Sequence, residues 1–487
     1  MKPWLTKSRF VAGQQCHKRL RQQCHDRLED SAPTGVVATG NSVGELAHRL
    51  FPKGYLVDSA PQRLGDAVVI TTRAVQDGHP AVFEATLASG RLLVRIDILE
   101  RLTRRTWGIR EVKSSTRVKD EHLEDLAFQV HVARLCGFDV RSAEIVHVNS
   151  EYVRAKNGID VKKFFQRDEV LDQLGEYLAD LEKKIDALVA VIDQPACPSV
   201  APWDHCYAPT SCEFLDRCTE GFSEDWVLNL PRLGKKRSAE LQAAGVQRIG
   251  DIPSSIVLTP QQEIIRDSHR NGKPFIAPAL KAGLKPFRRP ALYLDFESMA
   301  PAIPLHPKTR PYQRLPFQWS MHRAGRNGNL SHVEFLADAL SDPREPFLDS
   351  LLAALGDEDL PIVVYSGFEK STLAELAAAF PRRKVAITRV INRLVDLLPV
   401  VSNSVYYPAF NGSFSTKAVG PVLASSIRYD ELEQIGDGGA ASAAFEAIAS
   451  GLVADTEEIR FTREALLRYC HLDTLAMVEV HNCLGRL

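Results

Sequence analysis

The chain has 487 residues, which is too long for one hydrophobic core of ordinary size, so we expect two or three domains. Its hydrophobic and charged fractions, 45% and 25%, are those of an average globular protein and exclude a disordered chain, a coiled coil and a disulfide-dense secreted scaffold. The net charge of −1 does not exclude a nucleic-acid-binding protein, because a net value hides local concentrations of charge.

Two segments are locally basic. Residues 101–119 hold seven basic residues against Glu111, and residues 1–27 hold seven against Asp26. Such runs are often only solvated faces, but here they flank the motifs described below. The N-terminal candidates for contacts with nucleic-acid phosphate are Lys7, Arg9, Lys18 and Arg19, beside Lys2, Arg21 and Arg27.

The chain offers no sign of a membrane span or a signal peptide. No window approaches the roughly 18 consecutive apolar residues that a span needs, and the N-terminus MKPWLTKSRF lacks an apolar stretch. We therefore expect a cytoplasmic protein without a membrane partner. In that compartment the nine cysteines are expected to be thiols or metal ligands, and no protein partner is indicated.

Residues 1–222 alternate short β-branched runs with helical patterns, which predicts an α/β or α+β domain. Asp97 lies in an apolar strand pattern, and Glu111 and Lys113 form an E-x-K pair on one face of a later strand. Two carboxylates can hold Mg²⁺ while a lysine orients the attacking water, which suits phosphodiester hydrolysis. An isolated E-x-K also occurs on ordinary surface strands.

Cys206, Cys212 and Cys218 form a C-x5-C-x5-C set whose thiolates can converge on one metal centre. Four thiolates suit either zinc or a [4Fe-4S] cluster, and a spacing of five departs from the C-x2-C pairs of structural zinc. Cys24 and Cys197 are nearby substitute ligands. The apolar helical surroundings of the remaining cysteines predict packing roles for Cys136, Cys470 and Cys483.

These motifs resemble the RecB-like branch of the PD-(D/E)xK nucleases, which includes the CRISPR-associated iron-sulfur nucleases. The resemblance covers residues 1–222 and implies a restriction-endonuclease-like fold. It implies that Gln129, in LAFQVHVARLCGF, joins the catalytic set of Asp97, Glu111 and Lys113. In VGELAHRLFP it implies His48 as a metal ligand, with Glu45 as the alternative donor. It also implies Cys16 as the fourth ligand of a [4Fe-4S] cluster, with zinc as the alternative.

Residues 223–290 are expected to form a helical connector. LPRLGKKRSAELQAAGVQRIGDIP predicts a short helix, a Gly-containing turn and a second helix. This resembles a helix-hairpin-helix, whose hairpin N–H groups bind phosphate without reading sequence. Lys235, Lys236 and Arg237 strengthen that interpretation, although an ordinary αα-hairpin explains the pattern nearly as well.

Residues 291–487 alternate buried-strand runs with helices, the pattern of a second α/β domain. Asp295 and Glu297 share one strand face, Glu369 follows a later strand, and Tyr469 and Asp473 share a face of the last helix. Like charges so close call for a cation, although a structural carboxylate network is the alternative. Asp396 is a further acid to which we assign no catalytic role.

This second set resembles the tyrosine subclass of the DEDD exonucleases, marked by Y-x3-D, here YCHLD. The resemblance implies a ribonuclease H-like fold, two metal ions held by Asp295, Glu297, Glu369 and Asp473, water orientation by Tyr469, and 3′ to 5′ polarity. Glu369 departs from the aspartate usual in the second motif. The whole arrangement is similar to a bacterial family labelled a domain of unknown function.

The expectation is thus a Mg²⁺- or Mn²⁺-dependent DNA nuclease with two active sites. Its substrates would be single-stranded DNA or DNA ends, in repair or defence against foreign DNA. The alternatives are a nucleic-acid-binding scaffold with one or both sites inactive, and an RNA-processing exonuclease.

Overall fold

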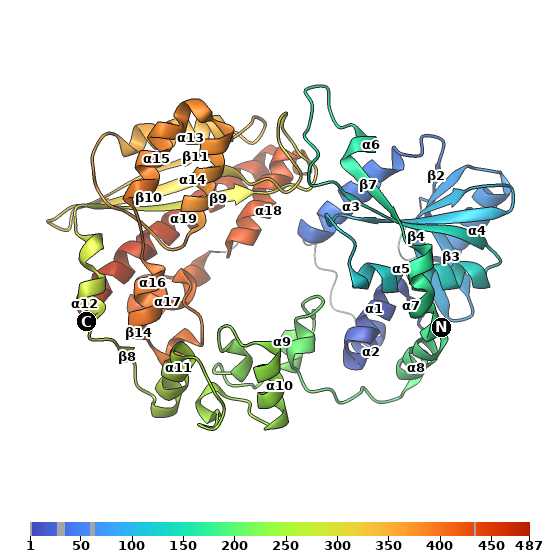
Figure 1. The fold of residues 1–487 in the computed structure, drawn as a ribbon, viewed down its shortest axis with the longest axis horizontal. Coiled ribbons are helices and arrows are strands. Elements are labelled where there is room, and N and C mark those ends of the chain that lie inside the picture. The colour runs from blue at the N-terminus through green and yellow to red at the C-terminus, as the bar shows by residue number, and fades with distance from the viewer. Residues whose placement is uncertain (1, 27–34, 59–63, 433–434) are drawn as a thin grey trace. The chain divides into compact units, whose positions relative to one another are not determined.

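A computed structural model of the chain describes residues 2–26, 35–58, 64–432 and 435–487, and the side chains of residues 35–38 are not described. Arg27 of the predicted basic segment lies outside the described residues. The chain divides into a first unit, 1–220 with 302–312, and a second unit, 221–301 with 313–487. Both units are mixed α/β, as predicted (Figure 1).

In the described part of the first unit, seven strands form one mixed sheet in the order β2-β3-β4-β5-β6-β7, with β1 pairing β4. Antiparallel pairing joins β3 to β4, β4 to β5 and β6 to β7, whereas β5 and β6 are parallel. The strands are β1 (Leu5–Thr6), β2 (Tyr55–Leu56), β3 (Ala81–Ser89), β4 (Leu92–Arg101), β5 (Thr106–Lys113), β6 (Asp139–Val148) and β7 (Phe165–Glu169).

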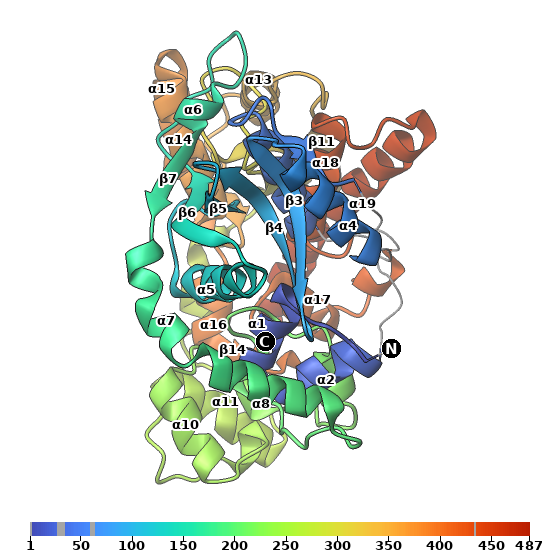
Figure 2. The same ribbon diagram turned by 90° about the vertical axis from the view of Figure 1, so that its right-hand side faces the viewer.

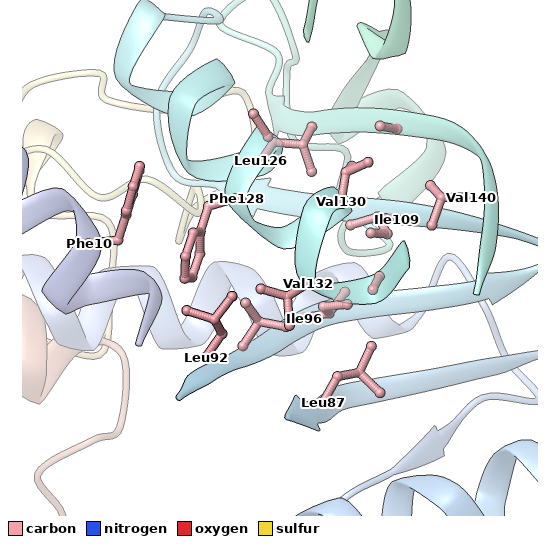
Figure 3. Close-up of a cluster of buried hydrophobic side chains, with 14 of the residues drawn as sticks. Phe10, Leu87, Leu92, Ile96, Ile109, Leu126, Phe128, Val130, Val132 and Val140 are labelled. Carbon is pink, nitrogen blue, oxygen red and sulfur yellow. The ribbon is translucent and has the colours of Figure 1, made fainter. Parts of the chain in front are cut away.

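The helices of the first unit are α1 (Lys7–Gln15), α2 (His17–His25), α3 (Gly35–His48), α4 (Leu64–Gln76), α5 (Asp120–Leu135), α6 (Val161–Phe164), α7 (Gly175–Ala179), α8 (Leu181–Asp193) and α9 (Leu215–Cys218). Several of these helices, among them α1, α3, α4 and α5, pack against the sheet of this unit. Helix α5 packs against β3, β4 and β6 on one side and against α1 and α7 on others, so it is buried on nearly every side (Figure 2). Phe128 of α5 stacks on Phe10 of α1, and Leu92 and Ile96 of β4 complete the packing beneath them (Figure 3).

In the described part of the second unit, five strands form a sheet in the order β11-β10-β9-β12-β13. Strand β10 is antiparallel to both of its neighbours, β11 and β9, whereas β9, β12 and β13 run parallel to one another. The strands are β9 (Ala291–Met299), β10 (Leu315–Ala324), β11 (Leu330–Leu336), β12 (Ile362–Val364) and β13 (Leu394–Asp396), and β8 (Phe275–Ile276) pairs separately with β14 (Val405–Tyr406).

The two faces of this second sheet differ in chemistry. The helices around it are α13 (Arg344–Leu355), α14 (Phe368–Ala379), α15 (Lys384–Arg393), α16 (Leu398–Ser404), α17 (Thr416–Leu423), α18 (Gly438–Ala449) and α19 (Thr456–Leu484). Alternate residues of β9 and β10, such as Leu294 and Met321, enter an apolar core with α13, α14 and α15. The intervening residues are polar, and α19 packs over them: Gln318 of β10 donates a 2.8 Å hydrogen bond to the carbonyl of Leu466. The carboxylates predicted from the strand period lie on this polar face.

The predicted helix pair of the connector is shorter than expected. Its helices are α10 (Lys235–Ala243), α11 (Pro260–Asn271) and α12 (Leu280–Gly283). The second predicted helix, after Gly245, is only the 3₁₀ turn Ile249–Asp251. Few residues separate Gly245 from Pro253, and the residue before a proline is biased away from the helical conformation. Among the described residues, no helix is long and apolar enough to cross a membrane.

Candidate functional sites

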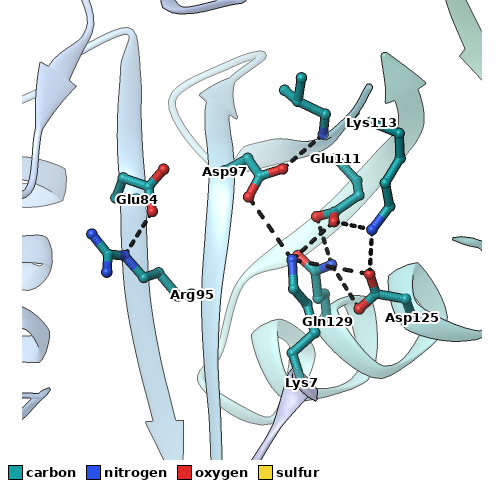
Figure 4. A network of polar contacts seen from close by, with 9 residues as sticks. Lys7, Glu84, Arg95, Asp97, Glu111, Lys113, Asp125 and Gln129 are labelled. Atoms are coloured by element: carbon teal, nitrogen blue, oxygen red, sulfur yellow. Dashed lines mark hydrogen bonds and ion pairs between the residues drawn. The ribbon is translucent and has the colours of Figure 1, made fainter. Parts of the chain in front are cut away.

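The first carboxylate site lies where β4, β5, α5 and α1 meet, and it contains Asp97, Glu111, Lys113 and Gln129 as predicted (Figure 4). The backbone N–H of Val112 donates to Asp97 Oδ2 at 2.8 Å, which orients that carboxylate beside the E-x-K strand. Gln129 Nε2 donates to Glu111 Oε2 at 2.7 Å. The structure therefore brings all four predicted residues together.

Sequence reasoning missed Asp125, the third carboxylate of this site. Lys113 Nζ lies 2.7 Å from both Glu111 Oε1 and Asp125 Oδ2. Asp125 precedes Gln129 by four residues on α5, so the two share a helix face. Once Gln129 is recognised, this spacing is the signal that could have found Asp125.

Lys7 occupies the centre of this site instead of an open surface. Its Nζ lies 2.8 Å from Glu111 Oε1, 3.8 Å from Asp97 Oδ1 and 4.0 Å from Asp125 Oδ2. Burial lowers the pKa of Lys7, but the three carboxylates outweigh burial and raise it well above its ordinary value. The ammonium therefore stands where a cation shared by the three carboxylates would lie.

The carboxylates of the first site respond differently to this environment. Burial, helped by the charge of Glu111, raises the pKa of Asp97 to about 7. Burial also acts to raise the pKa of Glu111, but Lys113 and Lys7 outweigh it and lower that pKa well below its usual range. Glu111 is thus the fixed anion of the site, whereas burial raises the pKa values of both Asp97 and Asp125, so a metal ion would displace protons from these two carboxylates.

Glu45 and His48 lie on α3, a helix that packs against β5. The His48 ring stacks on Phe83 with centroids 4.1 Å apart, and burial lowers its pKa. Among the described residues, neither side chain forms a group of three metal-ligating atoms within 4.8 Å with the carboxylates of the first site. A metal-binding role for Glu45 or His48 stays a prediction.

The four predicted cysteine ligands gather at one place in the first unit. Cys16 separates α1 from α2, and the N–H of Cys212 donates to the carbonyl of Cys206 at 2.8 Å. Burial raises the pKa of Cys206, and the neighbouring sulfurs of Cys16 and Cys218 raise it further. The predicted substitutes lie elsewhere: Cys24 packs against the hydrophobic core and Cys197 is exposed.

The spacing of these sulfurs bears on which metal centre they fit. No three of the four described sulfurs lie within 4.8 Å of one another. Four thiolates around one zinc at 2.3 Å would be about 3.8 Å apart. Thiolates of a four-iron cluster each bind a different iron and stand further apart. The donor set is therefore compatible with an iron-sulfur cluster.

Polar contacts hold the N-terminal helices against the segment that carries the later cysteines. Gln15 Nε2 donates to the carbonyls of His205 and Thr210, each at 2.7 Å, and Arg19 pairs with Glu213 at 2.7 Å. Arg9 donates to the carbonyl of Trp4 at 2.7 Å. Arg9 and Arg19 thus have internal partners, and their predicted phosphate contacts remain predictions, as does that of half-buried Lys18.

The second carboxylate site lies between β9, α14 and α19. Asp295, Glu297 and Asp473 each offer a carboxylate oxygen within 4.8 Å of the other two. Asp295 and Asp473 line a pocket of about 460 Å³ together with Glu369, which begins the first turn of α14. The predicted strand and helix faces thus place all four acids around one site.

Burial raises the pKa of every carboxylate in the second site, and repulsion between neighbouring acids raises that of Asp295 and Glu297 further. Burial, with the charge of Asp473, raises the pKa of Glu297 to about 8. Burial, with the charge of Asp396, raises that of Glu369 to about 8 as well. Burial followed by the charge of Asp473 raises the pKa of Asp295 well above its ordinary value. A cation is the group that would remove this repulsion.

Tyr469 and a lysine that sequence reasoning missed stand beside these acids. Tyr469 is hydrogen-bonded to Asp473, and Lys417 Nζ lies 4.9 Å from the centre of the Tyr469 ring. Tyr429, also missed, donates to Asp473 Oδ1 at 2.6 Å. Tyr429 and Lys417 come from segments without a recognisable local motif, so only the tertiary fold reveals them.

Cys470 is buried, as predicted, but it also touches a carboxylate. Its Sγ lies 3.6 Å from Asp295 Oδ2, so it contacts the second carboxylate site. Cys136 and Cys483 pack as predicted, each also donating to a backbone carbonyl. The apolar residues around Cys470 in the sequence predict its burial, but they do not show that α19 packs against the strand that carries Asp295.

A basic groove of about 1080 Å³ surrounds the start of α10 in the second unit. Its cationic lining is Arg232, Lys235, Lys236 and Arg237. Arg237 also donates to Gln262 Oε1 at 3.0 Å, whereas the two lysines are exposed. Gly234 caps the helix, so no side-chain hydrogen bond caps the first turn of α10.

Comparison with known proteins matches one segment of the chain. A family model described as "Domain of unknown function (DUF2779)" matches residues 292–415, less than half of the chain. This confirms the domain-of-unknown-function part of the predicted resemblance. The matched segment contains Asp295, Glu297 and Glu369 but ends before Tyr469 and Asp473.

Other comparisons add little. No curated protein matches the chain. A solved structure titled "Crystal structure of SSO0001" is similar at 15% identity, over 41% of this chain and 89% of that chain, with a TM-score of 0.18. A similarity this low leads to no conclusion about fold or function.

Proposed function

We propose that the chain is a Mg²⁺- or Mn²⁺-dependent nuclease with one active site in each unit, acting on single-stranded DNA or DNA ends. The observation that carries this proposal is the convergence of Asp295, Glu297 and Asp473 within 4.8 Å beside an open pocket. Three buried carboxylates so close are costly without cations, and such sets suit phosphodiester hydrolysis.

The second unit is proposed to be a ribonuclease H-like exonuclease of the DEDD tyrosine subclass. The sheet order β11-β10-β9-β12-β13, with three antiparallel strands followed by two parallel ones, supports this. Asp295, Glu297 and Asp473 would hold the ions, which when bound supply charge neutralisation at the phosphate and a more acidic water. The Tyr469 hydroxyl, held by Asp473, would orient the attacking water, and hydrolysis would proceed 3′ to 5′.

Glu369 would support one of the ions from the start of α14. Its side chain is one methylene longer than the usual aspartate, and Asp396 contributes to its raised pKa. The pocket wall beside it includes Tyr365, Ser366 and Phe414. An aromatic ring and small polar groups at such a wall are suited to stacking a base and binding a terminal nucleotide.

The first unit is proposed to be a RecB-like PD-(D/E)xK nuclease. Asp97 and Glu111 would hold Mg²⁺, and Lys113 would orient the water and offset charge on the phosphate. The hydrogen bonds from Val112 to Asp97 and from Gln129 to Glu111 support this geometry. Because the Lys7 ammonium contacts the same carboxylates, Lys7 must move when a metal ion binds.

We propose that Cys16, Cys206, Cys212 and Cys218 hold a [4Fe-4S] cluster. The cluster would supply a covalent clamp between α1 and the end of the first unit, without a redox step in the reaction. The contacts of Gln15 and Arg19 with the later segment support such a clamp. Basic Lys18 lies close enough to Cys206 to lower its pKa, against the larger effect of burial.

Phosphate contacts outside the active sites are proposed at the basic groove of α10. Exposed lysines and free first-turn N–H groups bind phosphate oxygens without reading sequence. Lys235 and Lys236 are the main candidates, because Arg237 already has an internal partner. Their replacement should weaken DNA binding at all sequences and reduce its salt dependence.

A second candidate function is favoured by Lys7. Since its ammonium satisfies the first carboxylate site without a metal ion, the first unit could clamp DNA while only the second unit cuts. RNA is the alternative substrate of the second unit.

The test is digestion of labelled single-stranded DNA and RNA by wild type, Lys113→Ala and Asp295→Asn in the presence of Mn²⁺. If both sites cut, each variant loses a different part of the product ladder. Loss confined to Asp295→Asn supports the clamp function for the first unit. Unchanged cleavage by both variants refutes the enzyme proposal.

A further inference from the structure

Three histidines that the proposed nuclease chemistry does not use meet on the polar face of the second sheet. His322 of β10 and His332 of β11 are directly opposite in the antiparallel register, and His471 comes from α19. One ring nitrogen of each lies within 4.8 Å of one from each of the others. The ring centroids are 4.2 to 4.8 Å apart.

Two of the three imidazoles are in the form that binds metals. Burial lowers the pKa of His322 to about 3 and that of His332 to about 4. Both rings are therefore neutral at physiological pH, and each has a lone pair on one nitrogen. The nearest anion is Glu334, whose Oε2 lies 3.9 Å from His332 Nε2.

A chain of hydrogen bonds fixes which nitrogen of two rings is free. Thr474 Oγ1 donates to the carbonyl of His471 at 3.0 Å, so it must accept from Ser320 Oγ and from His322 Nδ1, each at 2.8 Å. Ser320 has then used its only hydrogen and accepts from His332 Nε2 at 2.8 Å. This donor count leaves lone pairs on His322 Nε2 and His332 Nδ1.

We propose that His322, His332 and His471 bind one divalent transition-metal ion of the Zn²⁺ class. Imidazole nitrogen is a preferred ligand of such ions, and the hydroxyls behind the rings provide the outer support that orients metal-bound histidines. A tetrahedral ion with Zn–N bonds of 2.0–2.1 Å needs nitrogens about 3.4 Å apart, closer than the 4.8 Å limit within which the three nitrogens lie, so the rings must turn toward the ion when it binds. Water takes the fourth position.

This site is separate from the second carboxylate site. His471 lies two residues from both Tyr469 and Asp473, so its side chain leaves α19 about 200° around the helix from theirs. An ion at the histidines would tie β10 and β11 to the helix that carries Tyr469 and Asp473. The inference does not depend on the proposed nuclease function.

The experiment measures zinc in the full chain. Wild type, His332→Gln, His471→Gln and the control His79→Gln, whose ring lies beside Tyr55 in the first unit, are incubated with excess ZnCl₂, desalted and analysed by mass spectrometry for zinc per chain. Glutamine keeps the size and hydrogen bonding of the ring but is a poor zinc ligand. Zinc at the cysteines or carboxylates cancels in the difference between wild type and variant.

We expect each cluster variant to hold one zinc fewer than wild type and His79→Gln. Equal zinc in wild type and both cluster variants overturns the proposal. Hydrogen exchange of wild type provides a check that needs no variant, because zinc should slow exchange in peptides of β11, a strand without predicted nuclease ligands. No change in those peptides overturns the proposal as well.

Discussion

Lys7→Met tests whether the first carboxylate site is built for a cation. The substitution keeps an unbranched side chain of similar length and removes an ammonium 2.8 Å from Glu111, whose side chain is 1% exposed. Glu111 keeps its contacts with Lys113 and Gln129 in this variant, so the loss is that of one charge-assisted hydrogen bond, about 1.5–3 kcal/mol. We expect the first unit to lose this much stability in EDTA.

Mn²⁺ should restore much of that loss. A metal ion at the three carboxylates replaces the missing charge, and binding at 100 times the dissociation constant contributes about 2.7 kcal/mol. In wild type the ion must first displace Lys7, so Mn²⁺ should stabilise the variant more than wild type.

The assay is urea unfolding with and without Mn²⁺, followed by hydrogen exchange of peptides from β4 and β5, which report on the first unit alone. The control is Lys2→Met, which removes an exposed ion pair with Asp193 at a similar distance, 2.9 Å. Exposed pairs contribute about 0–1 kcal/mol, so this variant should resemble wild type. The reasoning fails if Lys7→Met is as stable as Lys2→Met in EDTA, or if Mn²⁺ stabilises both equally.

Further predictions concern the other sites. Glu297 has its pKa raised to about 8, so between about pH 4.5 and 8 the folded chain keeps a proton that the unfolded chain has released, and the metal-free stability should fall as the pH rises through this range. Melting in EDTA at a series of pH values should show a smaller dependence of stability on pH in Glu297→Gln than in wild type. An unchanged dependence would contradict this. Tyr469→Phe should lower kcat of the exonuclease about 100-fold with little change in KM, which steady-state kinetics would measure; full activity would exclude the tyrosine from the reaction. Cys212→Ala should lose the brown absorbance of the cluster and melt earlier, and retained iron in elemental analysis would argue against this ligand set. Gly412→Ala should lower the free energy of unfolding in urea by about 2 kcal/mol or more, because its φ is +82° and a Cβ would lie 1.9 Å from the carbonyl oxygen of Asn229. The control Gly451→Ala, where φ is +77° and the space around a Cβ is open, should lower it by less.

Local patterns predicted most of the two carboxylate sites. A strand period of two placed Asp295 beside Glu297, and a helical spacing of four placed Tyr469 beside Asp473, because these relations depend only on the geometry of one element. The same helical rule connects Gln129 to the unnoticed Asp125. Such positions are readable whenever a motif marks one member of the set.

Residues that reach a site from distant segments were not predictable in this way. Lys7 looked like part of a basic surface, yet α1 carries it into a carboxylate cluster about a hundred residues away in sequence. The three histidines come together because of the register of β10 against β11 and the packing of α19. Neither can be predicted from a single sequence. The loop 302–312 likewise belongs to the first unit through contacts such as that of Arg154 N–H with the carbonyl of Thr309.

The central claim is that the chain has two separate metal-dependent nuclease sites. The most direct measurement is digestion of 5′- and 3′-labelled DNA and RNA by wild type, Lys113→Ala, Asp295→Asn and the double variant, with metal content determined on the same preparations. We predict that each single variant retains part of the cleavage, that 3′ to 5′ degradation disappears with Asp295→Asn, and that the double variant is inactive. Cleavage by the double variant at the wild-type rate would contradict the account.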